Sequence, residues 1–377
     1  MKDRAIVILG GYGTAGRLIA LWLLRKTDAK LVIAGRDIEH AEIFAGELNS
    51  EFPGERARAE KVDASDPRQL RRSFHDARMV LVASSTSMFT DVIVGAALDS
   101  QIDYIDIQYS SSKVAYLKSI SRRIEELGLC FITDGGFHPG LPGVMVRWAG
   151  NEFDKIEKAV VTSLIRIDWK RLDVGKATIE ELLTGIEDYD SSAFIEGRWR
   201  KPSFFSSSGY LREDFGAPFG KRYCAPMFLE EMRSLPELYP SLRNAGFYVG
   251  GFNWFVDYFV FPVAMVAMKL WPQFSMRASS ALMRFGVRRF SRPPYATILK
   301  LDAAGLKDGR ARELEATLSH EDGYVLTALP IVASLMQYLD GSIRKPGLFT
   351  QASIVDPARL IGDMTAMGAV WKVRWKT

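Results

Sequence analysis

The sequence predicts an α/β protein with a doubly wound Rossmann domain, built on a parallel sheet, and a second α+β domain. Three observations predict this class: short apolar runs alternate with helix-sized segments in the first third, the runs are continuously apolar, and a glycine-rich loop follows the first run. Continuous apolar runs are typical of strands buried on both faces. With 377 residues the chain suits two domains, which we place at residues 1–145 and 146–377.

The first domain should contain six strands and end near Gly136. The expected strands are Ala5 to Leu9, Leu31 to Ala34, Glu60 to Asp63, Met79 to Ala83, Tyr104 to Ile107 and Cys130 to Thr133. The clearest helices between them are Thr14 to Lys26, Ile38 to Leu48 and Ser111 to Leu127. This alternation favours crossover connections and hence a parallel sheet.

The second domain begins with a β-branched run, and its later elements are longer. We expect strands at Ile156 to Ile167, Ala296 to Leu301 and Glu313 to Ser319, and helices at Thr178 to Ile186 and Tyr324 to Leu339. This domain should supply the substrate pocket and a homodimer contact. The C-terminal segment should pack back on the first domain.

The composition is that of an ordinary globular protein, with 47% hydrophobic and 25% charged residues. Cys130 and Cys224 are too few for a disulfide framework, and neither lies in a metal-ligand spacing. The first residues lack an apolar stretch of the length a secretory signal needs. We therefore expect a cytoplasmic protein without a metal site.

The first loop has the GxGxxG spacing of a dinucleotide cradle, with Gly11, Gly13 and Gly16 directly between a strand and a helix. The intervening residues of the cradle are Tyr12, Thr14 and Ala15. Gly11 permits the turn, Gly13 lets the backbone approach a pyrophosphate, and Gly16 lets the helix pack against the sheet. Helix-start N–H groups then bind phosphate. The alternative is a glycine turn without a ligand.

The end of the second strand predicts NADP, and NADPH as the reductant. NAD enzymes place an acidic residue there, whereas this chain has Gly35 followed by Arg36. An arginine can pair with a 2′-phosphate in a bidentate manner. In the alternative, Arg36 is a solvated helix-start residue and Asp37 binds the ribose, which favours NAD.

Two more loops should line the cofactor, since ligands bind at the carboxyl ends of parallel strands. Asp63 follows the third strand and is placed to meet the adenine edge. Ser84, Ser85 and Thr86 follow the fourth strand, beside the nicotinamide half. Each of them has an alternative role as a cap or turn residue.

Several strings together resemble the saccharopine dehydrogenase-like oxidoreductases, which include saccharopine reductase, lysine 6-dehydrogenase, carboxynorspermidine dehydrogenase and lipid-linked enoyl reductases. They are GGYGTAGR, AGRD, VDASDP, YIDIQ and TDGGFHPGLPG, and in the C-terminal part HEDGYVLTALPIVASLMQYLDG and KPGLFTQASIVDP. The similarity is best from Ile6 to about Ala149, and the middle, from about Lys170 to Arg292, departs from the pattern. The resemblance implies hydride transfer with a pyridine nucleotide and leaves the substrate open.

The resemblance also implies that two loops face the nicotinamide. The first contains Tyr104, Asp106 and Tyr109, and the second contains Gly135, Gly136, Phe137, His138, Pro139 and Gly140. His138 is our candidate for proton transfer, because imidazole titrates near neutral pH. Asp106 and Tyr109 are further catalytic candidates. A loop-anchoring hydrogen bond is the alternative for His138, and a turn contact for Asp106.

Other polar residues are candidates for substrate binding or ordinary surface. They are Arg166, Lys170, Arg171, Tyr223, His320 and Tyr324.

The middle of the chain is apolar and then basic. Between residues 247 and 268 Asp257 is the single charge, but Gly250, Gly251 and Pro262 argue against a membrane span. A buried core or dimer-interface element is one interpretation. The other is a peripheral membrane contact through residues 247–292, because an apolar segment precedes a basic amphipathic helix.

The basic residues that carry this second interpretation are Arg277, Arg284, Arg288 and Arg292, which we expect along one helical face. No motif supports nucleic-acid binding.

We therefore expect an NADP-dependent oxidoreductase that transfers a hydride between nicotinamide and either a C=C bond of a lipid-like substrate or a C=N bond. An amino-acid or opine-type dehydrogenase acting on an imine is the nearest alternative. A non-catalytic NADP-binding protein or a membrane-surface scaffold is the alternative of another class.

Overall fold

The computed structural model describes residues 4–169, 189–202 and 209–376. They form two compact units: unit 1 is Met1–Leu141 with Thr327–Met367, and unit 2 is Pro142–Leu326 with Gly368–Thr377. The chain thus leaves unit 1 at Leu141 and returns to it for the C-terminal helices. Lys170, Arg171 and the expected helix from Thr178 to Ile186 lie outside the described residues.

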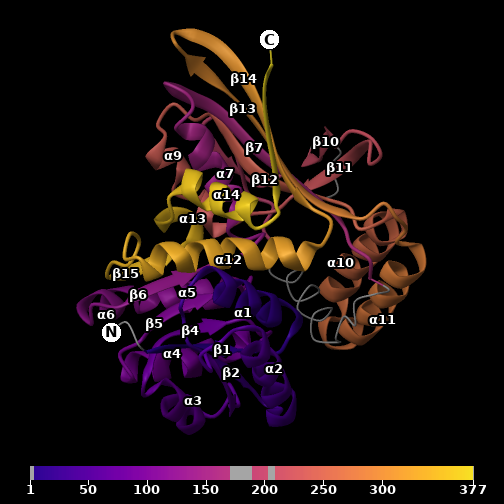
Figure 1. Cartoon of the computed structure of the whole chain (residues 1–377). Coiled ribbons are helices and arrows are strands. Elements are labelled where there is room, and N and C mark those ends of the chain that lie inside the picture. Colours follow the sequence, from indigo (N-terminus) through magenta and orange to yellow (C-terminus); the bar gives the residue numbers. More distant parts are fainter. Residues whose placement is uncertain (1–3, 170–188, 203–208, 377) are drawn as a thin grey trace. The chain divides into compact units, whose positions relative to one another are not determined.

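Unit 1 is built on a parallel sheet, as predicted (Figure 1). Its described strands are β1 (Ala5–Leu9), β2 (Leu31–Gly35), β3 (Ala57–Lys61), β4 (Ala77–Val82), β5 (Asp103–Asp106), β6 (Cys130–Thr133) and β15 (Gly347–Thr350). Their order is β15-β6-β5-β4-β1-β2-β3, which reverses direction between β1 and β4 as a doubly wound sheet does. The prediction missed β15, which pairs with β6 from the far end of the chain.

The described helices of this unit connect and cover the strands. They are α1 (Thr14–Lys26), α2 (Ile38–Glu51), α3 (Pro67–Phe74), η1 (Ser87–Phe89), α4 (Thr90–Asp99), α5 (Ser111–Ser119), α6 (Ser121–Glu126), α12 (Gly323–Leu339), α13 (Gln351–Ile354) and α14 (Pro357–Ala366). Helix α12 starts in unit 2 and continues into unit 1.

Two predicted elements have different bounds. The single helix expected from Ser111 to Leu127 is interrupted at Ile120. The hydroxyls of Ser119 and Ser121 donate to carbonyls of the preceding turn, a side-chain bond that competes with regular helix. The third strand ends at Lys61, before Asp63, because Asp63 forms a turn with Ser65.

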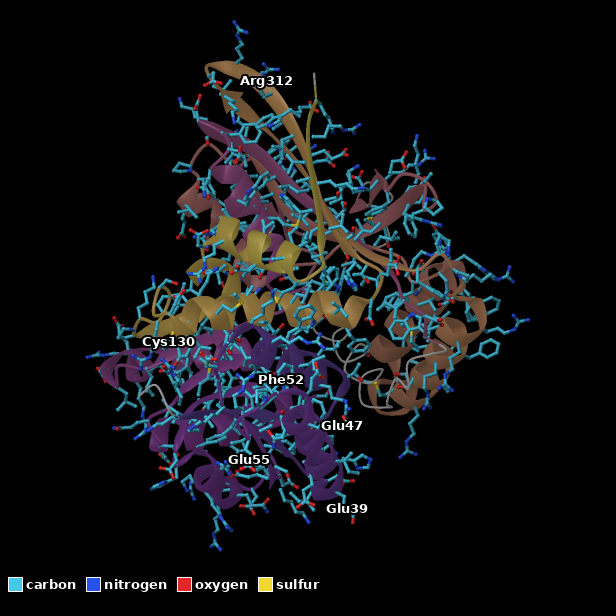
Figure 2. All side chains as sticks on the ribbon, viewed as in Figure 1. Glu39, Glu47, Phe52, Glu55, Cys130 and Arg312 are labelled. Carbon is cyan, nitrogen blue, oxygen red and sulfur yellow. The ribbon has the colours of Figure 1, made fainter. Side chains whose placement is uncertain are left out.

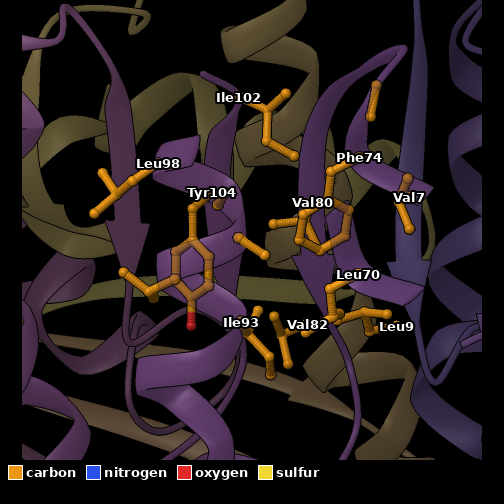
Figure 3. Packing of buried hydrophobic residues seen from close by; sticks show 14 of the residues in the cluster. Val7, Leu9, Leu70, Phe74, Val80, Val82, Ile93, Leu98, Ile102 and Tyr104 are labelled. Carbon is orange, nitrogen blue, oxygen red and sulfur yellow. The ribbon is translucent and has the colours of Figure 1, made fainter. Parts of the chain in front are cut away.

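The core of unit 1 lies between β1, β4 and the helices on one face of the sheet (Figure 3). Val7 and Leu9 of β1 and Val80 of β4 are completely or almost completely buried. Phe74 of α3 and Tyr104 of β5 fill the space beside them. This packing holds the carboxyl ends of β1 and β4 next to each other.

Unit 2 contains a mixed sheet of nine strands among the described residues, in agreement with the α+β prediction. These strands are β7 (Lys155–Arg166), β8 (Ala193–Ile195), β9 (Arg198–Arg200), β10 (Leu211–Asp214), β11 (Lys221–Pro226), β12 (Asn244–Gly250), β13 (Ala296–Lys307), β14 (Arg310–His320) and β16 (Val370–Lys376). Strands β7 and β12 are parallel, and the other pairs are antiparallel.

The β13–β14 hairpin is longer than the two strands expected from the sequence. Asp308 and Gly309 form its turn with φ angles of 52° and 69°. Positive φ at both central residues is the type I′ geometry that joins twisted strands.

The described helices of unit 2 are α7 (Leu141–Gly150), η3 (Glu230–Met232), α9 (Leu235–Leu238), the π-helix η4 (Val256–Val260), α10 (Phe261–Leu270) and α11 (Pro272–Phe290). Helices α10 and α11 pack side by side (Figure 1). Within the described ranges, no helix has the length and apolarity that crossing a bilayer requires. The expected row of four arginines is wrong in one position: Arg292 lies beyond α11, because Ser291 is extended and Pro293 follows.

Candidate functional site

The glycine loop lies at the point where the strand order of unit 1 reverses. Gly10 directly follows β1 with a φ of +81°, and a Cβ there would lie 2.7 Å from Cβ of Ser84. Ser84 follows β4, so the two loops are in direct contact. In open α/β sheets this reversal point is the usual place for a ligand.

The three glycines of the motif differ in their surroundings. A Cβ on Gly16 would lie 2.2 Å from the carbonyl oxygen of Gly10, so α1 can pack against β1 only with glycine there. Gly13 is the N-cap of α1 and provides no side-chain cap. The first-turn N–H groups, which include those of Thr14 and Ala15, therefore have no side-chain acceptor at the N-cap and suit a pyrophosphate. These residues fit a dinucleotide.

Tyr12 covers the end of β2. A Cβ on Gly35 would lie 2.3 Å from Cε1 of Tyr12, so the ring occupies the space that a side chain at position 35 would need. The Tyr12 hydroxyl also accepts a hydrogen bond from the N–H of Asp37 at 3.0 Å. Tyr12 therefore positions the segment that follows β2.

Arg36 is exposed at this end of the strand, and its guanidinium has no hydrogen-bond or ion-pair partner within the described part of the chain. Asp37 is engaged elsewhere: its carboxylate accepts from the N–H of His40 and pairs with the His40 ring at 2.7 Å. These bonds from His40 lower the pKa of Asp37. The arrangement leaves Arg36 available for a 2′-phosphate while Asp37 caps α2.

Asp63 lies after β3 in a tight turn. Its Oδ1 accepts from the N–H of Ser65 at 2.9 Å and from the Ser65 hydroxyl at 2.7 Å. These two hydrogen bonds lower the pKa of Asp63, and the positive charge of Arg36 contributes. The turn role is thus present, and contact with adenine stays a prediction.

The loop after β4 is held by its own hydroxyls and by Gln108. The Ser84 and Thr86 hydroxyls lie 3.1 Å apart. The Gln108 amide donates to the Ser84 carbonyl at 2.6 Å and to the Thr86 hydroxyl at 3.2 Å. Ser85 lies between them and is exposed. Gln108 follows β5, so it ties two neighbouring strand ends together.

Asp106 ends β5 and is completely buried. Its carboxylate accepts from Nζ of Lys113 at 2.6 Å, from the Thr133 hydroxyl at 2.8 Å, and from backbone N–H groups. Nζ of Lys113 also donates to Asp134 at 2.9 Å. Burial disfavours the charged amine, but the carboxylates of Asp106 and Asp134 raise the pKa of Lys113. The cluster fixes the loops after β5 and β6.

The glycine-proline loop after β6 is clamped by Gln351 from the C-terminal segment. The N–H of Gly136 donates to the Gln351 side chain at 3.1 Å. Gly136 has a φ of +109°, a conformation that favours glycine. A Cβ on Gly135 would lie 2.7 Å from the carbonyl oxygen of Asp106, so this loop packs tightly on the end of β5.

His138 is partly exposed, and its ring lies 4.4 Å from that of Phe137. Loss of hydration in this packed loop lowers the pKa of His138 to about 4, so the ring is neutral at pH 7. Tyr109 is half-buried in the loop between β5 and α5. The catalytic roles of His138, Tyr109 and Asp106 stay predictions.

The residues that support these loops were not predicted from the sequence. Asp103 binds the N–H of Cys130 with one oxygen, and the Tyr338 hydroxyl and Arg344 guanidinium with the other. Lys113 and Gln351 were not singled out either. Only Lys113 carries a local signal, because it is one helical turn from the buried Leu117.

The candidates in unit 2 have local contacts. The Arg166 guanidinium donates to the Arg292 carbonyl at 2.7 Å. The His320 ring bonds to the backbone of Asp322, and Tyr223 is exposed. Among the described residues no cluster of His, Cys, Asp or Glu could hold a metal ion, and Cys130 and Cys224 are buried free thiols.

Residues 6–126 match the family model described as the saccharopine dehydrogenase NADP binding domain. No curated protein matches the sequence. Among solved structures, saccharopine dehydrogenase (L-Glu forming) from Saccharomyces cerevisiae is similar at a TM-score of 0.70, with 14% identity and all of both chains covered.

Two further structures are less similar. A meso-DAPDH variant from Clostridium tetani has a TM-score of 0.44 and 11% identity over 95% of this chain and 96% of that one. A short-chain dehydrogenase/reductase from Mycobacterium ulcerans has a TM-score of 0.30 and 14% identity over 35% of this chain and 66% of that one.

Proposed function

We propose that the chain transfers a hydride from NADPH to a C=C bond of a lipid-like substrate, as an oxidoreductase of the saccharopine dehydrogenase-like kind. Residues 6–126 match the NADP-binding domain model of that family, and the fold is similar to that of the yeast saccharopine dehydrogenase. The choice of NADPH rests on Arg36, whose guanidinium has no hydrogen-bond or ion-pair partner within the described residues, while the neighbouring Asp37 is occupied in capping α2. The observation that favours a lipid-like substrate is the apolar surface of α10 and α11, where Leu270 and Trp271 are 58% and 63% exposed.

The residues of unit 1 would hold the cofactor by three kinds of contact. The glycine loop offers N–H groups to the pyrophosphate, Arg36 pairs with the 2′-phosphate, and the hydroxyls of Ser84 and Thr86 bind the nicotinamide half. NADPH, when bound, supplies the hydride. The buried Asp106–Lys113 pair would act indirectly, because it fixes the loop that carries Tyr109.

His138 would orient the substrate and complete the reduction with a proton. A neutral imidazole keeps one N–H that can donate to a substrate oxygen. A negative charge developing beside the ring favours its protonated form, so the ring would take a proton from solvent and pass it to the substrate carbon that does not receive the hydride. With a pKa of about 4 the ring does not titrate near neutral pH, contrary to the reason for which the sequence favoured it, so it would be protonated only as this charge develops.

A second candidate is an imine of the amino-acid or opine type. The fold likeness to the yeast saccharopine dehydrogenase over the whole chain favours it. This substrate needs cations for its carboxylates.

The test is NADPH oxidation, followed at the nicotinamide absorbance, with two matched substrate panels. One panel holds enoyl thioesters and isoprenoid lipids of increasing chain length, and the other holds 2-oxo acids paired with amino acids. Turnover in the first panel that rises with chain length supports the proposal. Turnover confined to the second panel supports the imine candidate and contradicts the lipid one.

A further inference from the structure

The second unit presents a patch of exposed apolar side chains on consecutive helical elements. It consists of Trp254, Tyr258, Phe259, Val263, Val266, Leu270, Trp271 and Phe285, and these are eight of the sixteen exposed large hydrophobic residues of the described chain. Scattered apolar side chains are normal on a surface, whereas half of them within 32 consecutive residues indicates an interaction site.

The helical elements that carry the patch, η4, α10 and α11, also have buried apolar residues on another face. Val256, Val260 and Ala264 are buried, and from α11 so are Met283 and Val287. Since these side chains already form the core of the helix pair, the exposed ones are not needed to hold it together.

Four of the exposed residues of η4 and α10 lie in a row. Phe259, Val263, Val266 and Leu270 follow one another at intervals of four, three and four residues, which is the spacing of one helical face. Trp271, the non-helical residue that joins α10 to α11, is exposed next to the end of this row. The row is therefore an apolar face along the length of α10.

Helix α11 adds positive charge beside this face. Arg277, Ala281, Phe285 and Arg288 are exposed and lie on one side of the helix, with Arg284 next to them. No carboxylate among the described residues pairs with Arg277, Arg284 or Arg288. From Tyr258 to Leu301 there is no Asp or Glu, while seven Lys and Arg residues occur.

We propose that this surface, formed by residues 254–292, docks on an anionic lipid bilayer. Exposed Trp, Tyr and Phe suit the interface of a bilayer, and unpaired arginines suit its phosphates. Charge argues against a second copy as the occupant, since a two-fold contact would bring the arginines of both copies together. The contact that we propose is peripheral, through an apolar helical face flanked by arginines.

The test uses the full chain and sedimentation with vesicles of phosphatidylcholine alone or with phosphatidylglycerol. We expect binding to the mixed vesicles that weakens as salt is added, and much weaker binding to the neutral ones. The triple variant R277Q/R284Q/R288Q should lower the partition coefficient on the order of a hundredfold, since each basic residue near such a surface contributes roughly a kilocalorie per mole.

The matched control for charge is R310Q/R312Q. Both arginines are exposed in unit 2, and Arg312 lies near the turn of the β13–β14 hairpin, away from α11 (Figure 2). This control should bind like the wild type. The apolar part of the contact is tested by W271E, which should abolish binding. Its matched control is I43E, which should bind like the wild type, because Ile43 is as exposed as Trp271 (61% and 63%) but lies outside the patch.

Four results would overturn the proposal. The first two are equal binding to neutral and anionic vesicles, and binding that is unchanged by both R277Q/R284Q/R288Q and W271E. The third is self-association that W271E removes, which would identify a second copy as the occupant. The fourth is binding to polyglutamate without binding to vesicles, which would identify an acidic protein instead. Circular dichroism and the NADPH dissociation constant of each variant show that it is folded, and neither readout depends on the substrate proposed above.

Discussion

The ring of Tyr12 occupies the space next to Gly35 that a side chain would need. A Cβ at position 35 would lie 2.3 Å from Cε1 of the ring. Glycine at the end of β2 therefore has two consequences. It removes the acidic side chain that selects NAD, and it admits a tyrosine that accepts from the N–H of Asp37 and so holds the backbone directly after Arg36.

Replacement of Gly35 by Asp should weaken NADPH binding more than tenfold without producing an NADH-binding protein. The new side chain collides with Tyr12, so the ring and the N–H of Asp37 that it holds must move. Fluorescence titration with both cofactors measures this effect. The double variant G35D/Y12A removes the collision and should gain affinity for NADH relative to G35D. Tight NADPH binding by G35D would mean that the Tyr12 ring moves freely.

Arg36→Gln should raise the NADPH dissociation constant about tenfold to a hundredfold and leave the NADH constant within about twofold. Hydrogen bonds to charged groups contribute about 1.5–3 kcal/mol, and only NADPH has the 2′-phosphate. Arg72→Gln, on the exposed face of α3, is the control. Equal losses for both cofactors would place Arg36 on a shared phosphate, and tighter NADH binding by the wild type would refute the assignment.

Local signals explain what the sequence predicts well. The glycine loop, β1 and the position of Arg36 depend on residues close together in the chain, so spacing reveals them. Gln351 clamps Gly136 across 215 residues, and β15 joins the sheet from the same segment, so periodicity carries no sign of either contact.

The buried ion pairs of Lys113 also could not be predicted from nearby residues in the sequence. Lys113 and Lys118 occur on the same short helix, yet Lys113 is 1% exposed and buried, whereas Lys118 is an exposed residue. The difference comes from Asp106 and Asp134, which belong to two strand ends that become neighbours only in the folded sheet.

Lys113→Met should destabilise the protein by about 3–5 kcal/mol, because it leaves the buried carboxylates of Asp106 and Asp134 without their cation. Urea unfolding followed by circular dichroism measures the change. Adding D106N and D134N removes both charges and should recover a large part of the loss. Lys118→Met on the exposed side is the control. A K113M protein as stable as the wild type would contradict the structural role of the cluster.

Asp257 should make the wild-type protein less stable at pH 8 than at pH 5. Burial raises the pKa of Asp257 from 3.8 to about 7, although backbone N–H groups and Arg222 oppose the shift. The folded state thus binds the proton more tightly than the unfolded state. Stability contributed by this proton is lost as the pH rises from about 4 to about 7.

The variant D257N isolates this effect, since an amide oxygen still accepts from the N–H of Phe252. Its urea midpoint should change less between pH 5 and pH 8 than that of the wild type. D308N, in the hairpin turn, is the matched control and should keep the wild-type slope. The same slope in D257N and the wild type would show that Asp257 ionises at its ordinary value.

His138→Asn should lower kcat about 10²- to 10⁴-fold and change the NADPH dissociation constant less than threefold, if the ring takes part in proton transfer. Asparagine keeps a hydrogen-bond donor but cannot carry the proton, so a purely loop-anchoring ring would lose little. The low pKa of His138, about 4, arises from loss of hydration. Its own ionisation should therefore be absent from the kcat profile of the wild type between pH 6 and 8.

The control for this last variant is H75N, at the exposed end of α3, which should retain wild-type turnover. Single-turnover rates with deuterated solvent add a second readout. A solvent isotope effect present in the wild type and lost or altered in H138N supports proton transfer through the ring. Unchanged turnover in H138N would contradict the role and leave Tyr109, half-buried in the neighbouring loop, as the next residue to replace.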